Sequence, residues 1–322
     1  MRFCFLGTGR TPIPPPGRGA VETILWAYRN ELVARGHHVS IVNVKSDRLW
    51  AALPLAVRRE GPFDWVWCHQ ERMVPITTFW GRVLGFRTLE TTHRPVSDVE
   101  PVDRFSAWQF RRAARAPYHA CLQEDLAVAM RALNPKSRAM VLPNATEVGA
   151  YTWRPGGNGR AVCLGGVSSR KRQAVVAVAL EGSGVHCDFI GPIDHDDDHT
   201  RLIAAHPNYL GSWSREDVVE RLTDYSCLVL FSVAECHPLV VGEAMAAGLS
   251  VVVSSSSTAN MDVSLPWVTV VDDPRELGCA VKRAISENPA HRSAIRDYAE
   301  KNLAYGPTLN RLLAQLREWQ DS

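Results

Sequence analysis

Glu235-Cys-His-Pro-Leu-Val-Val-Gly-Glu243 runs on into Ala-Met-Ala-Ala-Gly248-Leu-Ser-Val-Val-Val-Ser254, and this stretch decides the fold. A proline suits the first helical turn, because its missing N–H has no partner there. The pattern predicts a helix over 239–247 that ends at Gly248, a residue suited to the left-handed conformation that closes helices. The apolar run after it is typical of a buried strand.

Glu235 and Glu243 lie on either side of the start of this helix. The first turn offers unpaired N–H groups and the positive end of the helix dipole, which together favour a phosphate. A phosphate held there leaves two carboxylates to address hydroxyl groups on either side of it. The stretch therefore predicts a site for a nucleotide sugar.

The length of 322 residues predicts about two domains. The composition is ordinary for a globular protein, and no apolar run is long enough to span a bilayer. The first residues predict a short strand and not a signal peptide. Eight scattered cysteines without a C-x-x-C pair favour reduced thiols in a cytosolic enzyme.

Charge is distributed unevenly along the chain. Residues 1–150 carry 20 Lys and Arg against 13 Asp and Glu, whereas the rest carries 16 against 21. The first half thus suggests an anionic partner, such as a lipid phosphate, a membrane surface or a nucleic acid. Arginines dispersed over the surface are an equally good account. The clusters Arg58-Arg59 and Arg111-Arg112, with Arg115, are the places where such a partner would bind.

Strand patterns alternate with amphipathic helix patterns along nearly the whole chain. Strands are predicted at 2–6, 38–44, 65–68, 87–91, 139–142, 161–165, 185–190, 227–231, 250–254 and 268–271. Helices are predicted at 21–35, 75–84, 103–113, 124–133, 173–181, 216–224, 239–247, 274–287, 289–303 and 309–319. The alternation predicts an α/β protein with two doubly wound, Rossmann-like domains.

We expect the N-terminal domain at 1–152, the C-terminal domain at 153–305, and a final helix at 306–322 that crosses back to the first domain. The break falls within 151–160, where Trp153-Arg-Pro-Gly-Gly-Asn-Gly has the composition of a linker. Ligands bind beyond the carboxyl ends of strands in open parallel sheets, so the domains are expected to face each other across a cleft.

Glycines also follow the first predicted strand, in Gly7-Thr-Gly-Arg-Thr-Pro-Ile-Pro-Pro-Pro-Gly17-Arg-Gly19. They permit close approach of the backbone to a ligand before a helix that begins near Val21. The spacing differs from G-x-G-x-x-G, and no acidic residue ends the second strand. A dinucleotide is therefore disfavoured.

His93 and His69 each follow a predicted strand, at the edge of the sheet where ligands bind. An imidazole there can hydrogen-bond a sugar hydroxyl or a phosphate, and the strand-end position favours His93. Capping of a strand end is the alternative for both residues.

Three consecutive cations, Arg170, Lys171 and Arg172, follow the first strand of the second domain. They would neutralise a diphosphate leaving group, with Lys171 as the best candidate, and a solvated basic turn is the alternative. Asp194-His-Asp-Asp-Asp-His199 has metal-ligand residue types, but the run predicts a solvated loop and no metal site.

These residues resemble the retaining glycosyltransferases of family 4, which have the two-domain GT-B fold, over nearly the whole chain. Glu235–Gly248 is similar to the family's E-x7-E motif and EAMAaG extension, which is the most specific match. More modest matches follow in the family's order: Gly17–Glu22, Arg35-Gly-His-His-Val, Val141-Leu-Pro-Asn144-Ala, Ala161–Lys171 and Tyr209-Leu-Gly-Ser-Trp213.

The resemblance implies three catalytic residues. Glu235 would hold the donor sugar together with nearby backbone N–H groups. Lys171 would neutralise the phosphate, and His93 would lie over the transferred sugar.

The resemblance also implies donor-binding residues. The amides of Leu239 and Val240 would touch the diphosphate, and Glu243 would hydrogen-bond the ribose. The neighbourhoods of Gly191 and Trp213 would enclose the base. The other implied donor-binding residues are Gly17, Gly19, Arg170, Arg172, Cys236 and His237.

The chain departs from the family at a few positions. Gly166 stands where the family usually has arginine, so one phosphate cation is missing unless Arg170 or Arg172 replaces it. Ala145 and Cys236 stand where glycine is common. The chain is also short for the family, which implies trimmed loops in the acceptor domain. These departures bear on efficiency and on the acceptor more than on the reaction.

We therefore expect a cytoplasmic, metal-independent hexosyltransferase that moves a sugar from a UDP- or GDP-sugar to an acceptor with retention of configuration. No cofactor beyond the donor is expected. A sugar-nucleotide 2-epimerase of the same fold and a non-catalytic nucleotide-sugar-binding protein stay open. A glycan, a lipid-linked acceptor, a natural product and a modified nucleic acid all fit as acceptors. Peripheral contact with a membrane through the basic first half is also left open.

Overall fold

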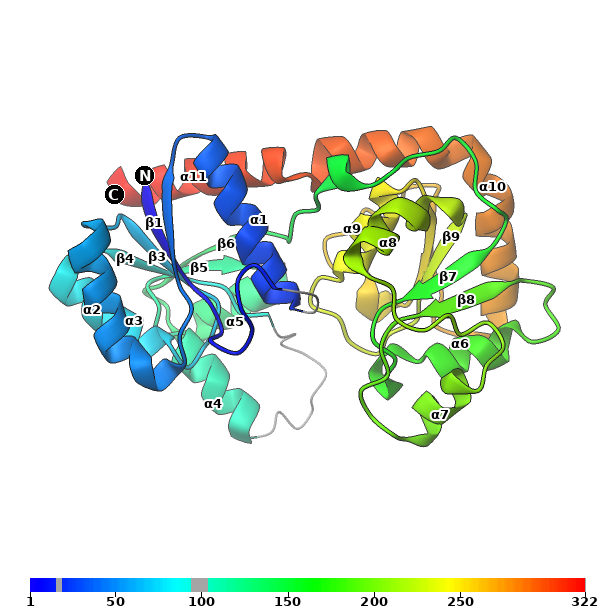
Figure 1. Ribbon diagram of the computed structural model, residues 1–322, viewed down its shortest axis with the longest axis horizontal. Helices are drawn as coiled ribbons and strands as arrows, with labels where there is room; N and C mark the ends of the chain where they lie inside the picture. The colour runs from blue at the N-terminus through cyan, green and yellow to red at the C-terminus, as the bar shows by residue number, and fades with distance from the viewer. Residues whose placement is uncertain (16–18, 94–103, 322) are drawn as a thin grey trace. The chain divides into compact units, whose positions relative to one another are not determined.

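The computed structural model describes residues 1–15, 19–93 and 104–321. They form two compact units (Figure 1), one of Met1–Asn144 with Thr308–Ser322 and the other of Ala145–Pro307. Each unit is a parallel β-sheet with helices on both faces, as the alternation of patterns predicts.

The first unit contains β1 to β6 and the helices between them. Its elements are β1 (Arg2–Leu6), α1 (Ala20–Ala34), β2 (His38–Val42), α2 (Leu49–Glu60), β3 (Trp65–Cys68), α3 (Val74–Leu84), β4 (Arg87–Glu90), α4 (Arg104–Ala113), β5 (Tyr118–Cys121), α5 (Glu124–Leu133), β6 (Arg138–Val141) and most of α11 (Tyr305–Asp321). The described strands pair in parallel in the order β2-β1-β3-β4-β5-β6.

Side chains of the central strand β3 alternate between the two faces of this sheet. Trp65 and Trp67 face α11 and α1, where Trp319 and Tyr28 pack with ring centroids 6.3 and 5.4 Å away, respectively. Val66 faces the opposite side and joins the apolar cluster of α2 and α3. The final helix is thus part of the core of the first unit.

The second unit has its own sheet and core. Its elements are β7 (Ala161–Leu164), α6 (Gln173–Leu180), β8 (Cys187–Ile190), α7 (Asp198–Ala204), α8 (Arg215–Arg221), β9 (Cys227–Leu230), α9 (Leu239–Ala246), β10 (Ser250–Val253), β11 (Val268–Val270) and α10 (Leu277–Tyr298). The described strands are parallel in the order β11-β10-β9-β7-β8. β9 and β10 are buried along their whole length, in keeping with their unbroken apolar sequences.

The fold class and the predicted strands are confirmed, but three elements were missed. β5 reads Tyr-His-Ala-Cys and lacks the β-branched residues that mark a strand. α2 contains Pro54, and α7 begins in a polar run that suggested a loop.

A predicted helix break at Pro289 is wrong, because α10 runs through it without interruption. Buried residues on both sides of the proline, including Ala284, Arg292 and Ile295, hold one face of the helix in the core. Packing therefore outweighs the loss of one helical hydrogen bond.

The two units part at Asn144 and Ala145, whereas the sequence placed the break within 151–160. The amide of Thr146 donates to the Leu303 carbonyl at 2.8 Å, and Val148 and Tyr151 are buried in the core of the second unit. No described helix is long and apolar enough to cross a membrane.

Candidate functional site

The helix predicted at 239–247 is α9, which ends at Ala246, and Gly248 follows the capping residue with the expected left-handed conformation at a φ of 85°. The amide of Val241 donates to the Pro238 carbonyl at 3.2 Å, so Pro238 is the residue before the first turn. The amides of Leu239 and Val240 belong to the first turn, which has no carbonyl of its own helix to bond. The carboxyl end of β9 and the positive end of α9 thus meet at 231–240.

Glu235 lies in the loop that leads from β9 to α9, with only 11% of its side chain exposed. Its Oε1 is 3.0 Å from Nη1 of Arg170. Arg170 also donates to the Ala234 carbonyl at 2.5 Å, and its own carbonyl accepts from the amide of Val233 at 2.9 Å. The loop after β7 is therefore fastened to the loop after β9, and the structure brings Glu235 and Arg170 together.

Lys171 lies beside the same two loops. A Cβ on Gly165 would be only 2.8 Å from the Lys171 ammonium nitrogen, so the lysine side chain occupies the place that a side chain at 165 would need. Burial lowers the pKa of Lys171, while Glu235 and Glu243 act in the opposite direction. The ammonium is thus a partly desolvated cation in the field of both carboxylates.

Glu243, one turn inside α9, is paired with Arg215, which the sequence did not single out. Nη1 of Arg215 donates to Oε1 of Glu243 at 2.6 Å and also to the hydroxyl of Tyr151. The guanidinium lies 5.0 Å from the centre of the Tyr151 ring. Arg215 begins α8 two residues after Trp213, so a cation next to the predicted base site was the signal that could have identified it.

The loops after β7 and β8 meet closely at Gly191. Its φ is 150°, and a Cβ there would lie 2.1 Å from the Gly165 carbonyl oxygen. The amide of Gly191 donates to Gly211 at 2.9 Å, and its carbonyl accepts from the Tyr209 hydroxyl at 2.9 Å. These bonds join Gly191 to the loop that carries Trp213.

The remaining predicted donor-binding residues of the second unit have other contacts. The Arg172 guanidinium lies 5.7 Å from the centre of the Phe231 ring. Burial raises the pKa of Cys236 to about 12, so this thiol is not ionised near neutral pH. Burial also lowers the pKa of His237 to about 4, which keeps the imidazole neutral.

In the first unit, His93 and His69 form a pair at the carboxyl ends of β4 and β3. Nδ1 of His69 lies 3.0 Å from Nε2 of His93, and the two rings are stacked with centroids 5.4 Å apart. Burial lowers the pKa of His93 to about 4 and that of His69 well below its usual range. Both imidazoles are therefore neutral hydrogen-bonding groups at physiological pH.

Gly19 precedes α1 with a φ of 145°, and a Cβ there would be 2.9 Å from a carboxylate oxygen of Glu22. Glu22 is buried and accepts a hydrogen bond from the Thr8 hydroxyl. Gly17 lies outside the described residues.

The basic clusters of the first unit lie at the end of α2 and at the end of α4, with Arg115 in the turn after α4. Arg112 lies 4.5 Å from the centre of the Trp108 ring and donates to the Arg72 carbonyl at 3.0 Å. Arg58 and Arg59 are exposed at the end of α2.

The run 194–199 is not simply a solvated loop, which corrects the sequence interpretation. Asp197 caps α7 by accepting from the amide of Thr200, and the Asp197 amide donates to the Thr200 hydroxyl. Nε2 of His199 lies 3.3 Å from the side-chain oxygen of Gln173. No group of three or more potential metal ligands gathers anywhere in the described ranges.

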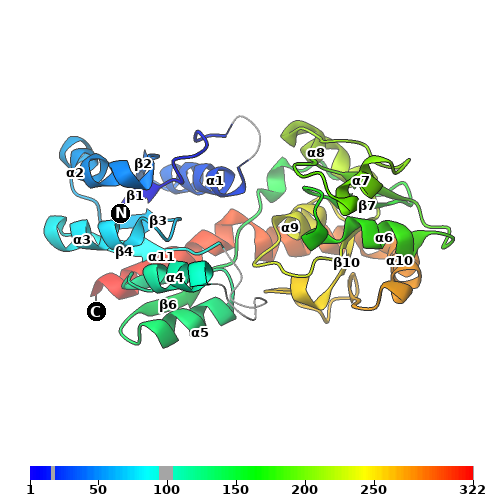
Figure 2. The same ribbon diagram turned by 90° about the horizontal axis from the view of Figure 1, so that it is seen from below.

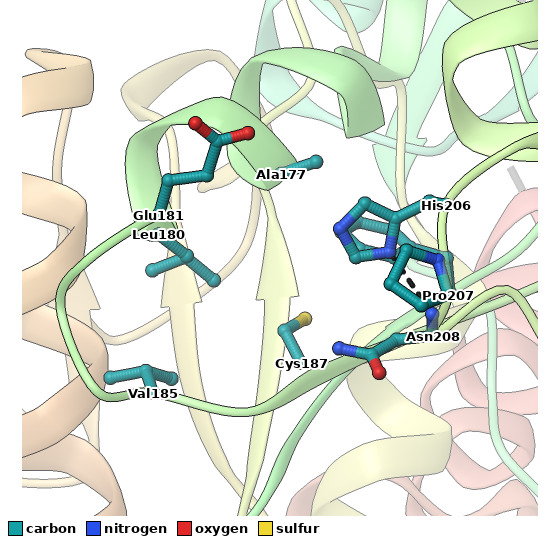
Figure 3. Close-up of a pocket in the computed structure, with 9 residues that line it drawn as sticks. Ala177, Leu180, Glu181, Val185, Cys187, His206, Pro207 and Asn208 are labelled. Atoms are coloured by element: carbon teal, nitrogen blue, oxygen red, sulfur yellow. Dashed lines mark hydrogen bonds between the residues drawn. The ribbon is translucent and has the colours of Figure 1, made fainter.

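A separate hollow of about 190 Å³ lies beside the edge strand β8 (Figure 3). The side chains around it come from the end of α6, from β8 and from His206, Pro207 and Asn208. His206 accepts from the Asn208 amide at 3.2 Å, and its ring packs 5.0 Å from Phe189. The hollow does not include the loops at the carboxyl ends of the strands, where ligands bind in such sheets.

Comparison with known proteins supports the fold over the whole chain. HepE from Anabaena, solved in complex with UDP, is 15% identical over 99% of this chain and 100% of its own, with a TM-score of 0.73. Sucrose-phosphate synthase from Thermosynechococcus elongatus is 13% identical over 100% and 99%, with a TM-score of 0.75. AviGT4, a glycosyltransferase involved in avilamycin A biosynthesis, is 15% identical over 99% and 98%, with a TM-score of 0.71.

The chain therefore has the GT-B fold, as predicted. Residues 170–302 match the sequence profile of the family described as Glycosyl transferases group 1. No curated protein sequence gives a significant match. Membership of family 4 and retention of configuration stay predictions.

Proposed function

We propose that the chain is a retaining glycosyltransferase of family 4 that transfers a hexose from a UDP- or GDP-sugar to an acceptor without a metal ion. The observation that carries the proposal is the start of α9, whose first-turn amides have no carbonyl of their own helix to bond and lie in the chain between Glu235 and Glu243, the two carboxylates that act on Lys171. HepE has been solved with UDP and with UDP-glucose, and residues 170–302 match group 1 glycosyltransferases. Both facts support a nucleoside-diphosphate sugar as the donor.

The diphosphate would lie at the first turn of α9. Amides at a helix start and a partly desolvated lysine stabilise negative charge much better than water-exposed groups do. Lys171 and Arg170 would oppose the charge that develops on the leaving phosphate oxygen. Arg170 takes on this role because Gly166 supplies no cation.

Glu235 and Glu243 would bind hydroxyl groups and not act as an acid and base pair. Glu243 would accept from the ribose hydroxyls while Arg215 holds its other side. Glu235 would accept from the sugar while Arg170 keeps its carboxylate oriented.

The reaction needs no nucleophile from the protein. The bond between the anomeric carbon and the diphosphate breaks, and its electron pair goes to the phosphate oxygen. The acceptor hydroxyl then bonds to the same face of the sugar, and its proton passes to the departing diphosphate. The neutral thiol of Cys236 is in keeping with this route. The protein contributes positioning and charge stabilisation.

The acceptor and the location belong to the proposal as well. The excess of cations in the first unit supports an anionic acceptor or partner, and a lipid-linked acceptor is our choice among the open classes. Free thiols at all eight cysteines, seven of them buried, support a cytoplasmic enzyme.

The donor is tested by adding UDP-glucose, GDP-mannose and dTDP-glucose separately and measuring thermal stabilisation and slow hydrolysis of the sugar. We expect one donor to stabilise the wild type and release its sugar as the α-anomer, with EDTA having no effect. Glu243→Ala should weaken the binding of this donor more than tenfold, because a hydrogen bond to a charged group contributes about 1.5–3 kcal/mol.

Glu216→Ala is the matched control, since Glu216 is an exposed carboxylate on the neighbouring helix α8. It should bind the donor as the wild type does. An epimerised nucleotide sugar formed without acceptor would show a 2-epimerase instead. The absence of binding by any donor would overturn the proposal.

A further inference from the structure

A patch of large apolar side chains is exposed on α2 and α3 of the first unit. Trp50 on α2 is 48% exposed, and Phe79 and Val83 on α3 are 48% and 58% exposed. We call these three residues, with the partly buried Trp80, the aromatic patch. α2 and α3 lie side by side in both views (Figures 1 and 2). They also share the apolar cluster that covers one face of the sheet.

The members of the patch form one continuous surface. The Trp50 ring lies 5.2 Å from Phe79 and 6.1 Å from Trp80, and Phe79 lies 5.3 Å from Trp80. Val83 follows Phe79 by one helical turn and extends the same face. Single exposed apolar residues are ordinary, but a contiguous group of them indicates a binding surface.

Cations lie on the two helices that carry the aromatic patch. Arg82 lies between Phe79 and Val83 in the chain and is exposed on α3. The segment 45–60, which includes α2, carries four cations against the two acids Asp47 and Glu60. Over the whole first unit, the sequence has 22 Lys and Arg against 14 Asp and Glu. The helices α2 and α3 therefore combine exposed apolar side chains with cations, in a unit with an excess of positive charge.

The combination of exposed aromatic side chains and cations distinguishes between the possible binding partners of the patch. A symmetric contact with a second copy would place the cations of both copies in one interface, which is unfavourable. Unpaired bases would need open ring faces, but Trp50, Phe79 and Trp80 pack against one another at steep angles. Tryptophan among arginines and aliphatic groups is instead the composition that suits the boundary between lipid head groups and acyl chains.

We propose that the aromatic patch binds the surface of a membrane that contains anionic phospholipids. The aromatic and aliphatic groups enter the boundary between head groups and acyl chains, and the cations contact the lipid phosphates. Binding by this surface does not require the transferase reaction. It can therefore be tested even if the proposed function fails.

The test is co-sedimentation of the full chain with vesicles. We expect binding to an equimolar mixture of phosphatidylcholine and phosphatidylglycerol, weak binding to phosphatidylcholine alone, and loss of binding at high salt. The double variant Trp50→Ser/Phe79→Ser should bind the mixed vesicles at least about tenfold more weakly, because it removes most of the apolar area. Arg82→Gln should weaken binding about fivefold, the effect of one cation near an anionic surface.

Leu133→Ser is the matched control, because Leu133 is 47% exposed on α5 of the same unit and belongs neither to the aromatic patch nor to the arginine clusters. It should bind vesicles as the wild type does. If the double variant loses its native circular dichroism, Val83→Asp tests the same face with a single exposed substitution and is expected to reduce binding at least as much as Arg82→Gln.

Three results would overturn the proposal. The first is equal binding of wild type and double variant to the mixed vesicles. The second is a wild-type dimer that the double variant converts to a monomer, which would assign the patch to a second copy. The third is competition for the patch by single-stranded oligonucleotides but not by vesicles. Donor binding by the second unit is measured separately and is expected to be unchanged in all these variants.

Discussion

Lys171 is a cation whose surroundings act on it in opposite directions. Burial disfavours its charge, whereas Glu235 and Glu243 favour it, and the net effect is a lowered pKa. Glu243 in turn is held by Arg215, and Glu235 by Arg170. Each charge of the candidate site is thus set by one or two identifiable neighbours. The effect of a single substitution on donor binding can consequently be traced to the charge contact that it removes.

The affinity for UDP should fall as the pH rises through the alkaline range. The ammonium of Lys171 is charged below its pKa and neutral above it, and the lowered pKa moves the loss of charge below 10.5, the usual value for lysine. Titration calorimetry at several pH values measures the effect. Lys171→Arg should remove the pH dependence, because arginine stays charged. The same slope in the wild type and in this variant would contradict the assignment.

His69 should act on catalysis through His93. The bond of 3.0 Å between the two rings fixes the orientation of His93 and makes its tautomer depend on that of His69. His69→Leu should lower kcat about tenfold with little change in KM, since an unpaired buried imidazole costs about 1–3 kcal/mol. His69→Asn retains a polar group near the position of Nδ1 and should restore most of the rate. A wild-type rate in His69→Leu, in His69→Asn and in His93→Ala would exclude a role for the pair.

Loops between strands and helices hold most of the candidate site, and glycines determine how closely these loops approach. Gly191 can approach the Gly165 carbonyl only because it has no side chain, and the space beside Gly165 is filled by Lys171. The helix α9 was predictable almost to the residue, because its proline, apolar face and terminal glycine all indicate the same bounds. α2 and α7 could not be predicted, because Pro54 in α2 and the polar run at the start of α7 are typical of loops. In both cases the tertiary core and the helix cap decided the conformation.

Gly166→Arg should strengthen UDP binding about tenfold, by adding the phosphate cation that the resemblance to family 4 implies at this place. A Cβ on Gly166 would meet nothing nearer than the Pro192 carbonyl oxygen at 3.9 Å, so the loop accepts a side chain. Gly156→Arg is the control, because it adds the same charge at an exposed and uncrowded glycine of the same unit. Stronger binding in both variants would indicate a general effect of charge.

Over the whole molecule, the chain builds the first unit from both of its ends. α11 contributes Leu309, Leu312, Leu316 and Trp319 to the buried set. Trp319 packs against Trp65 and Tyr118, at the centre of a sheet whose strands come from the first half of the sequence. The stability of the first unit therefore depends on residues at the far end of the chain.

Trp319→Ala should destabilise the first unit by about 4 kcal/mol, the usual cost of a large cavity in a core. UDP binding by the second unit should remain. Chemical denaturation followed by circular dichroism, together with calorimetry, separates the two effects. Arg317→Ala, an exposed substitution on the same helix, should leave both unchanged. If UDP affinity fell together with the stability in Trp319→Ala, the two units would not behave separately.

The sequence by itself determined the two parallel sheets, because unbroken apolar strands and amphipathic helices alternate with a period that few other folds allow. It also determined the motif from Glu235 to Gly248, because caps, glycine and proline act locally. Only the tertiary structure paired Arg215 with Glu243 and His69 with His93, and only it continued α10 through Pro289. These features depend on residues distant in the chain or on packing against the core. Local patterns carry no information about such contacts, because side-chain partners are chosen by the folded arrangement of the elements.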